Sequence, residues 1–231
     1  MMPVTDQVEI IIAAHNEAGS IGEVVRGALS AVPDSVVTVV DDGSTDATSA
    51  QAIDAGAKVV HLWPNRGKGV ALREGIAAST GRWLVFIDGD GQDDPADIGK
   101  LLAQALDGVT LVNGSRFMGK LHDGAISGPN YLGNVFMTGV LDLCFGAKVT
   151  DSQAGFRVID GEFARGLRLW ARQYEIETEM LAKVLRAGGK VVEVPIDRYE
   201  RTAGTTDFRR IRNGLRILGT IFIERLRPQA R

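Results

Sequence analysis

The chain has 231 residues, of which 45% are hydrophobic and 24% charged, as is ordinary for a soluble globular protein. This length suits one domain with a full hydrophobic core and a short appendage. The net charge of −3 excludes general nucleic-acid binding, because that function needs a strongly basic face.

Strand and helix patterns alternate at short spacing through the first half of the chain, which predicts a doubly wound, mostly parallel α/β sheet. Two of the strands are apolar almost throughout, a pattern typical of strands buried on both faces. The expected strands are 8–14, 36–40, 58–62, 83–88 and 109–113. The expected helices are 20–31, 44–55, 70–79 and 95–106.

The second half of the chain has a different character. A glycine-rich polar segment, 120–130, predicts a mobile loop over a binding site. The expected elements here are helices at 131–145, 175–187 and 208–226 and a strand at 191–196. The last helix has apolar residues at helical period. We therefore divide the chain into a catalytic domain, 1–207, and a C-terminal amphipathic helix with its tail, 208–231.

The cysteine content and the hydropathy of the chain indicate the cellular compartment of the protein. The single cysteine, Cys144, excludes an internal disulfide framework and fits a reducing environment. The first residues lack a signal-peptide pattern, and no apolar run approaches the roughly 18 residues needed to span a bilayer. These features predict a cytoplasmic protein, either free or peripheral on the cytoplasmic face of the membrane.

Two acidic clusters directly follow apolar strands. Asp41 and Asp42 come after strand 36–40, and Asp88 and Asp90 come after the fourth strand. The carboxyl ends of strands in an open α/β sheet are where ligands bind, and carboxylates gathered there repel one another unless a cation lies between them. A divalent metal that carries a polyphosphate is the simplest such cation, so the sequence predicts an enzyme that handles a nucleotide diphosphate.

The second cluster has the composition of a metal site. Asp88 and Asp90, with the amide oxygen of Gln92, present oxygen ligands to one hard cation, and such ligands favour Mg²⁺ or Mn²⁺. The metal would neutralise a departing nucleoside diphosphate. The alternative is a solvated acidic turn before a helix. The acidic pair Asp41 and Asp42, suited to accept hydrogen bonds from ribose or base, favours the metal site.

Other candidate contacts lie near the same predicted sheet edge. Ala14 ends the first strand, and Asn16 and Glu17, just after it, would complete a nucleotide crevice. Lys68 lies in a glycine-rich loop before a helix, which is either an anion cradle or a surface turn. Arg116 follows the fifth strand and either holds a phosphate bidentately or pairs with a local aspartate.

Short motifs occur in order along nearly the whole chain. They lie at 10–17, 39–46, 65–69, 86–95, 114–117, 150–157, 174–180 and 192–196. Each is weak alone, but the ordered set resembles the family 2 glycosyltransferases, and within them the polyprenyl-phosphate (dolichol-phosphate) hexosyltransferases. The resemblance implies a GT-A fold and inverting transfer of one hexose from GDP-mannose or UDP-glucose to a polyprenyl phosphate.

The resemblance also implies roles for residues on the donor side. Glu17 and Asp42 would hold the nucleoside. Asp88, Asp90 and Gln92 would bind Mg²⁺ or Mn²⁺ and, through it, the diphosphate, and we expect Asp90 to be central to catalysis.

On the acceptor side, the resemblance implies that Arg116 contacts the acceptor phosphate. Asp151 would line the acceptor side as an orienting carboxylate or weak base, and Arg201 would approach the phosphates from a flexible loop. A phosphate monoester is already anionic near neutral pH, so the enzyme mainly has to position it and stabilise the leaving group. One family feature is missing: no arginine or lysine shortly precedes Gly133-Asn134.

Several interpretations stay open. The acceptor is either a polyprenyl phosphate or a soluble phosphorylated metabolite or glycan. A sugar nucleotidyltransferase would have a glycine-rich loop after the first strand, which this chain lacks, and a non-catalytic nucleotide-sugar-binding subunit would not need Asp88 beside Asp90. The C-terminal helix, with Arg209, Arg210, Arg212 and Arg216 on its polar side, either lies on an anionic membrane or packs on the domain or a second subunit. The oligomeric state is open.

Overall fold

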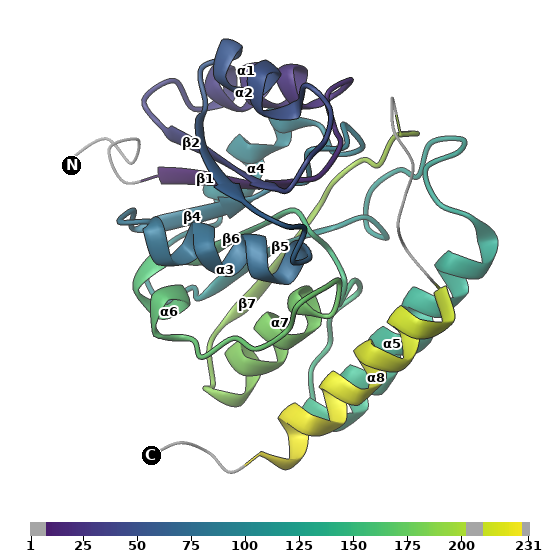
Figure 1. Ribbon diagram of the computed structural model, residues 1–231. Helices are drawn as coiled ribbons and strands as arrows, with labels where there is room; N and C mark the ends of the chain where they lie inside the picture. The colour runs from purple at the N-terminus through teal and green to yellow at the C-terminus, as the bar shows by residue number, and fades with distance from the viewer. Residues whose placement is uncertain (1–7, 202–209, 228–231) are drawn as a thin grey trace.

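The computed structural model describes residues 8–201 and 210–227, and its centre is a seven-stranded sheet (Figure 1). The strands are β1 (Val8–Ala14), β2 (Val36–Asp42), β3 (Lys58–Leu62), β4 (Trp83–Phe86), β5 (Leu111–Ser115), β6 (Arg157–Asp160) and β7 (Val191–Pro195). They are ordered β3-β2-β1-β4-β6-β5-β7, and β6 alone runs antiparallel to its neighbours. The predicted doubly wound, mostly parallel sheet is confirmed.

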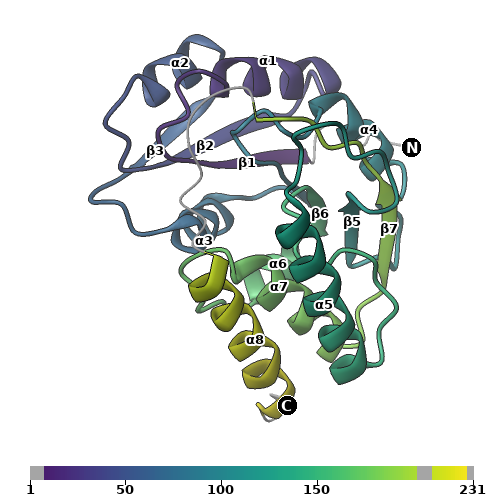
Figure 2. The same ribbon diagram turned by 90° about the vertical axis from the view of Figure 1, so that its right-hand side faces the viewer.

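Helices cover both faces of the sheet (Figures 1 and 2). One face carries α1 (Ile21–Ala31), α2 (Thr48–Asp54) and α4 (Ile98–Leu102), the last preceded by a 3₁₀ turn, η2 (Pro95–Asp97). The other carries α3 (Lys68–Ala78), α6 (Gly161–Gly166) and α7 (Ile176–Arg186).

The sheet residues alternate between two buried clusters, as the period of two in a strand requires. Along β1, Ile10 and Ile12 join the cluster under α1, while Ile11 joins the cluster under α3. All three side chains are fully buried. This explains why β1 reads as a continuous apolar run.

Two long helices, α5 (Gly128–Phe145) and α8 (Arg210–Leu226), pack side by side and project beyond the layered body (Figure 1). The buried Ile217 and Ile221 tie α8 into the cluster that contains α7. Both helices also expose large apolar side chains, namely Tyr131, Leu132, Val135, Phe136, Leu143, Ile211, Leu215, Phe222, Ile223 and Leu226. Within the described ranges, no helix is long and apolar enough to cross a membrane.

The structure corrects the predicted elements in a few places. β6 and α6 were not predicted. The helix expected at 95–106 is the turn η2 followed by the short α4. Residues 128–130, expected in the loop, form the first turn of α5, where Pro129 suits a position with no intrahelical N–H bond. Phe208 and Arg209, expected in the last helix, lie outside the described residues.

Candidate functional site

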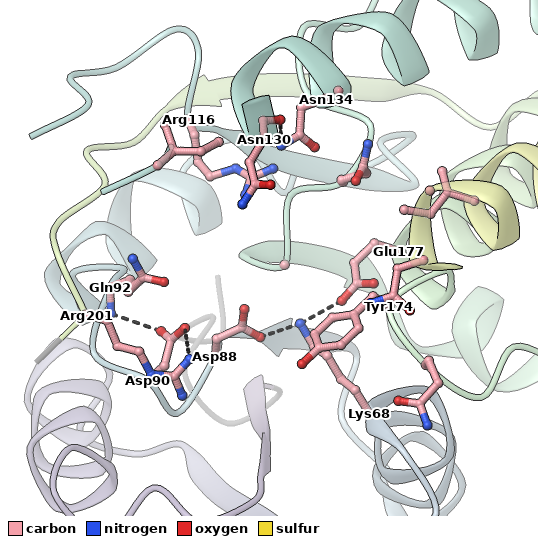
Figure 3. Close-up of a pocket in the computed structure, with 18 of the residues that line it drawn as sticks. Lys68, Asp88, Asp90, Gln92, Arg116, Asn130, Asn134, Tyr174, Glu177 and Arg201 are labelled. Atoms are coloured by element: carbon pink, nitrogen blue, oxygen red, sulfur yellow. Dashed lines mark hydrogen bonds and ion pairs between the residues drawn. The ribbon is translucent and has the colours of Figure 1, made fainter. Parts of the chain in front are cut away.

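A cavity of about 1040 Å³ opens at the carboxyl ends of the strands, beside the parallel neighbours β1 and β4, where the order of strands along the sheet reverses. It continues from this sheet edge to α5 and α8. Among its lining residues are Ala14, Glu17, Asp42, Lys68, Asp88, Asp90, Gln92, Arg116 and Arg201, all predicted from the sequence. Figure 3 shows many of these side chains converging from separate elements.

Asp42, at the end of β2, holds the loop that precedes α3. Its carboxylate accepts hydrogen bonds from the backbone N–H groups of Arg66 (2.7 Å) and Gly67 (2.6 Å). The side chain is buried, so these bonds give it the partners that a buried carboxylate needs. Asp42 therefore connects the cavity wall to the start of α3, and its predicted contact with the nucleoside stays a prediction.

Asn16 and Asp41 shape the turns around the cavity but do not line it. Asn16 has a positive φ of 56°, which asparagine tolerates, and its side chain accepts a hydrogen bond from the Thr45 N–H (2.9 Å). Asp41 accepts one from the Ser44 N–H (2.8 Å). Asn16 thus ties the β1 loop to the β2 loop, and Asp41 fixes the turn that follows β2, which favours a structural role for both over direct contact with a donor.

Glu17 and Arg201 meet across the cavity although they are far apart in sequence. The guanidinium of Arg201 pairs with the Glu17 carboxylate and also lies 3.7 Å from Asp90 Oδ2. Burial raises the pKa of Glu17 and outweighs the opposing effect of Arg201. The structure therefore brings Arg201 to the acidic end of the cavity, and its predicted contact with the phosphates stays a prediction.

Lys68, the first residue of α3, bridges two carboxylates (Figure 3). Its Nζ lies 2.6 Å from Asp88 Oδ1 and 2.7 Å from Glu177 Oε1. Burial alone would lower the pKa of Lys68, but Asp88 and Glu177 together raise it above its usual value. Burial likewise opposes ionisation of Asp88, yet the Lys68 charge lowers the pKa of that carboxyl. Of the two interpretations left open for this loop, the surface turn is wrong for Lys68, which is a largely buried cation beside the candidate metal ligand. The anion cradle stays a prediction.

Arg198 lies beside the carboxylates of Asp90 and Asp93, and it was not singled out from the sequence. Its guanidinium lies 2.6 Å from Asp93 and 3.7 Å from Asp90, and it donates a hydrogen bond to Gln92 Oε1 (2.9 Å). The Gln92 amide also donates to the carbonyl oxygen of Tyr199 (3.0 Å). Burial raises the pKa of Asp93 and outweighs the charge of Arg198.

Arg116 and Asp151 form a bidentate pair. Arg116 Nε lies 2.6 Å from Asp151 Oδ2 and its Nη2 lies 2.8 Å from Oδ1, and the backbone N–H of Arg116 completes the contact. Asp151 is fully buried and lies behind the cavity wall, whereas Arg116 lines the cavity. Burial opposes the ionisation of Asp151, but Arg116 lowers its pKa. A buried carboxylate with a lowered pKa and both oxygens engaged favours the orienting role over the base.

The donor atoms fit a divalent cation only in part. Among the described residues, no three His, Cys, Asp or Glu side chains are arranged to hold a metal ion. Asp88 and Asp90 do line the same cavity, and one or two carboxylates with substrate phosphates are a typical set for Mg²⁺. The Gln92 amide oxygen accepts a hydrogen bond from Arg198, and its nitrogen donates to the Tyr199 and Ala125 carbonyl oxygens, so its predicted ligation would have to share the oxygen with Arg198.

The end of the cavity away from the acidic cluster contains a group of amide side chains. Asn130 and Asn134 lie near Arg116 (Figure 3), and Gln153 also lines the cavity. Asn134 Oδ1 and Gln153 Nε2 are buried without a hydrogen-bond partner among the described residues. Buried polar atoms are normally satisfied, so these two are placed to bind a ligand. Gln153 lies in the motif at 150–157 and Asn134 in the pair Gly133-Asn134, but the sequence assigned neither amide a role.

Comparisons with known proteins agree with this geometry. A model of the family described as glycosyl transferase family 2 matches residues 9–159. Glycosyltransferase AglJ of Haloferax volcanii is 33% identical over 225 residues, which cover 96% of this chain and 72% of that protein. The undecaprenyl-phosphate mannosyltransferase of Micrococcus luteus is 32% identical over 209 residues, which cover 84% of each.

A solved structure shares the fold. Glucosyl-3-phosphoglycerate synthase from Mycobacterium tuberculosis, in complex with Mn²⁺, uridine diphosphate and glucosyl-3-phosphoglycerate, gives a TM-score of 0.77 at 23% identity, over 97% of this chain and 82% of that one. At this identity the likeness concerns the fold alone. With a family model that matches most of its length, this chain belongs to family 2 of the glycosyltransferases and has their GT-A fold.

Proposed function

We propose that the protein is an inverting hexosyltransferase that moves a sugar from GDP-mannose or UDP-glucose to a polyprenyl phosphate. The observation that carries this proposal is the shape and lining of the single cavity described above. One end has the carboxylates Asp88 and Asp90, and the other has Arg116 beside the apolar helices α5 and α8. A donor diphosphate fits the first end, and a lipid phosphate fits the second.

At the donor end, Asp88 and Asp90 would hold Mg²⁺ or Mn²⁺, and Glu17 and Asp42 would contact the nucleoside. The metal, when bound, supplies Lewis-acid stabilisation of the charge on the departing diphosphate. Arg201 pairs with Glu17 and lies close to Asp90, so it can reach the same phosphates. The solved structure that shares this fold was crystallised with Mn²⁺ and uridine diphosphate, which supports such a donor site.

At the acceptor end, Arg116 would position a phosphate monoester for direct attack on the anomeric carbon. The attacking oxygen is already anionic, so no strong base is required, and orientation supplies much of the rate. Asp151 fixes the Arg116 guanidinium by two hydrogen bonds. The proposed role of Asp151 is therefore to orient Arg116.

The acceptor's lipid would lie along α5 and α8. Met137, Ile211, Leu215 and Leu218 line the cavity where it runs between these helices, and Arg212 and Arg216 are exposed on α8. Apolar and cationic side chains on one pair of helices suit contact with an anionic membrane, which we place at the cytoplasmic face. The similarity to an undecaprenyl-phosphate mannosyltransferase supports a lipid-phosphate acceptor.

A soluble phosphorylated acceptor is the second candidate. The buried, unpartnered amide atoms of Asn134 and Gln153 favour it, because they would bind hydroxyl or carboxylate groups that a polyprenyl chain lacks. The fold likeness to glucosyl-3-phosphoglycerate synthase, crystallised with its phosphorylated product, is consistent with this candidate.

The test is donor binding by calorimetry, with GDP-mannose and UDP-glucose, each in Mn²⁺ and in EDTA. We expect metal-dependent binding of one donor that falls by about tenfold or more in Asp90→Ala. Asp107→Ala, an exposed aspartate paired with Arg82, is the control and should bind like the wild type. Product analysis with a short polyprenyl phosphate and with 3-phosphoglycerate then separates the two acceptors. Binding of neither donor would contradict the proposal.

A further inference from the structure

The Lys68 bridge lies where a divalent cation would have to bind. Its ammonium contacts Asp88, one of the two proposed metal ligands, and also Glu177 from α7 (Figure 3). The Lys68 side chain is 17% exposed and that of Glu177 is 6% exposed. In the described structure, Asp88 is therefore neutralised by a cation that belongs to the protein.

The backbone around this bridge is rigidly fixed. The Gly69 N–H donates to the Arg172 carbonyl (3.0 Å), and a Cβ at Gly69 would lie 2.6 Å from the Ala171 carbonyl oxygen. The start of α3 is thus packed directly against the segment that leads into α7. The backbones at Lys68 and Glu177 therefore keep their relative position, so any adjustment at the bridge is made by side chains.

We propose that Lys68 is the resident counter-cation of Asp88, and that Glu177 is a positioning residue that retains the Lys68 ammonium when Asp88 turns to a divalent cation. The inference rests on the proposed metal-dependent donor site and deepens it. Held by Glu177, the ammonium stays at the edge of the donor diphosphate instead of leaving as an unpaired buried charge, which would be costly.

With no nucleotide present, this arrangement predicts that substitutions of Lys68 and of Glu177 change the affinity for Mn²⁺ in opposite directions. Lys68→Met removes the competing cation, so Asp88 should bind Mn²⁺ more tightly, by about tenfold. Glu177→Gln leaves Lys68 with Asp88 alone, so Mn²⁺ should bind more weakly by a similar factor. With Mn²⁺ saturating, both variants should bind the nucleoside diphosphate more weakly, because the ammonium is absent or misplaced.

The same two changes in Mn²⁺ affinity would also result if each substitution acted only through its own charge on the metal. The double variant distinguishes that explanation from the proposed one. If the two charges act independently on the metal, their effects add, and Lys68→Met/Glu177→Gln returns to the wild-type affinity. If Glu177 acts through Lys68, its loss has no effect once Lys68 is gone, and the double variant binds Mn²⁺ as tightly as Lys68→Met. The double variant leaves one carboxylate, Asp88, at the bridge, whereas Lys68→Met leaves two, so it serves if Lys68→Met folds poorly.

The experiment is titration of Mn²⁺ into nucleotide-free protein, with unbound Mn²⁺ measured by electron paramagnetic resonance, and GDP and UDP binding measured afterwards by calorimetry. Glu74→Gln, on the exposed side of α3, is the control and should match the wild type. Additive effects, or effects of the same sign, in a protein whose wild type binds Mn²⁺ and nucleotide would overturn this inference alone. A wild type that binds neither would overturn the proposed function and this inference together.

Discussion

The buried charged side chains at the site mainly contact one another. Arg116 contacts Asp151 on one side and the cavity on the other, so its orientation depends on a carboxylate that no substrate reaches. Removing one partner of such a pair leaves an uncompensated charge in a poorly solvated place, which is more costly than removing both. We therefore expect mutation of Asp151, which lies behind the cavity wall, to destabilise the fold.

We expect Asp151→Asn to lower the free energy of unfolding by about 3–5 kcal/mol. The folded-state pKa of Asp151 is below its unfolded value of about 3.9, so its stabilisation is fully present above pH 4 or so and is lost as the pH falls through the folded pKa. Urea unfolding from neutral pH downward should show a constant difference between wild type and variant that shrinks in acid. A difference that grows on acidification would contradict this assignment.

The sequence predicted most of the residues at the donor end because they follow strands, and strand ends meet in a parallel sheet. It did not predict Arg198 or Glu177. Arg198 reaches Gln92 over 106 positions of the chain, and only the fold brings them together. Glu177 lies in a motif, but its pairing with Lys68 depends on how α3 packs against the start of α7.

At the scale of elements, β6 is a strand that the periodicity of the sequence did not predict. Arg157–Asp160 is four residues long and runs antiparallel between β4 and β5, so it interrupts the parallel order of the sheet. Its Val158 and Ile159 are fully buried on opposite faces. A segment this short has too few residues to show a strand period.

The contact between α3 and the segment before α7 predicts opposite effects on stability for alanine at two glycine positions. Gly69→Ala should destabilise the protein despite the better helix propensity of alanine, because the new Cβ would lie 2.6 Å from the Ala171 carbonyl oxygen, a backbone atom. Gly139→Ala in α5 meets nothing within 4 Å and should stabilise by about 0.5–1 kcal/mol. Thermal unfolding of the two variants measures the difference, and an equal gain in both would show that the segments are not in close contact.

At the scale of the whole molecule, α8 is part of the cavity wall as well as an appended helix. Ile217 and Ile221 are buried in the same cluster as α7, and Ile211 and Leu215 line the cavity. The amphipathic period of this helix was predicted from the sequence. Its packing was not, because the period shows only that one face is apolar and leaves its partner unspecified. The proposed division of the chain at residue 207 stays a prediction.

The exposed apolar side chains of α5 offer a test of membrane contact that leaves the cavity intact. Leu132 and Phe136 are 68% and 58% exposed and do not line the cavity, so Leu132→Asp/Phe136→Asp should fold normally. We expect the wild type to float with vesicles that contain phosphatidylglycerol, less so as salt screens the exposed arginines of α8. The double variant should lose about tenfold or more in vesicle binding, since each substitution withdraws apolar area from the lipid.

Leu106→Asp, at a residue 61% exposed on another part of the surface, is the matched control for that experiment and should float like the wild type. Light scattering on the same proteins distinguishes a lipid surface from a second copy of the chain. A wild-type dimer that the Leu132/Phe136 variant dissociates, with no flotation of either protein, would assign the α5 face to self-association. It would also favour the soluble acceptor, because a polyprenyl phosphate reaches an enzyme from within a membrane.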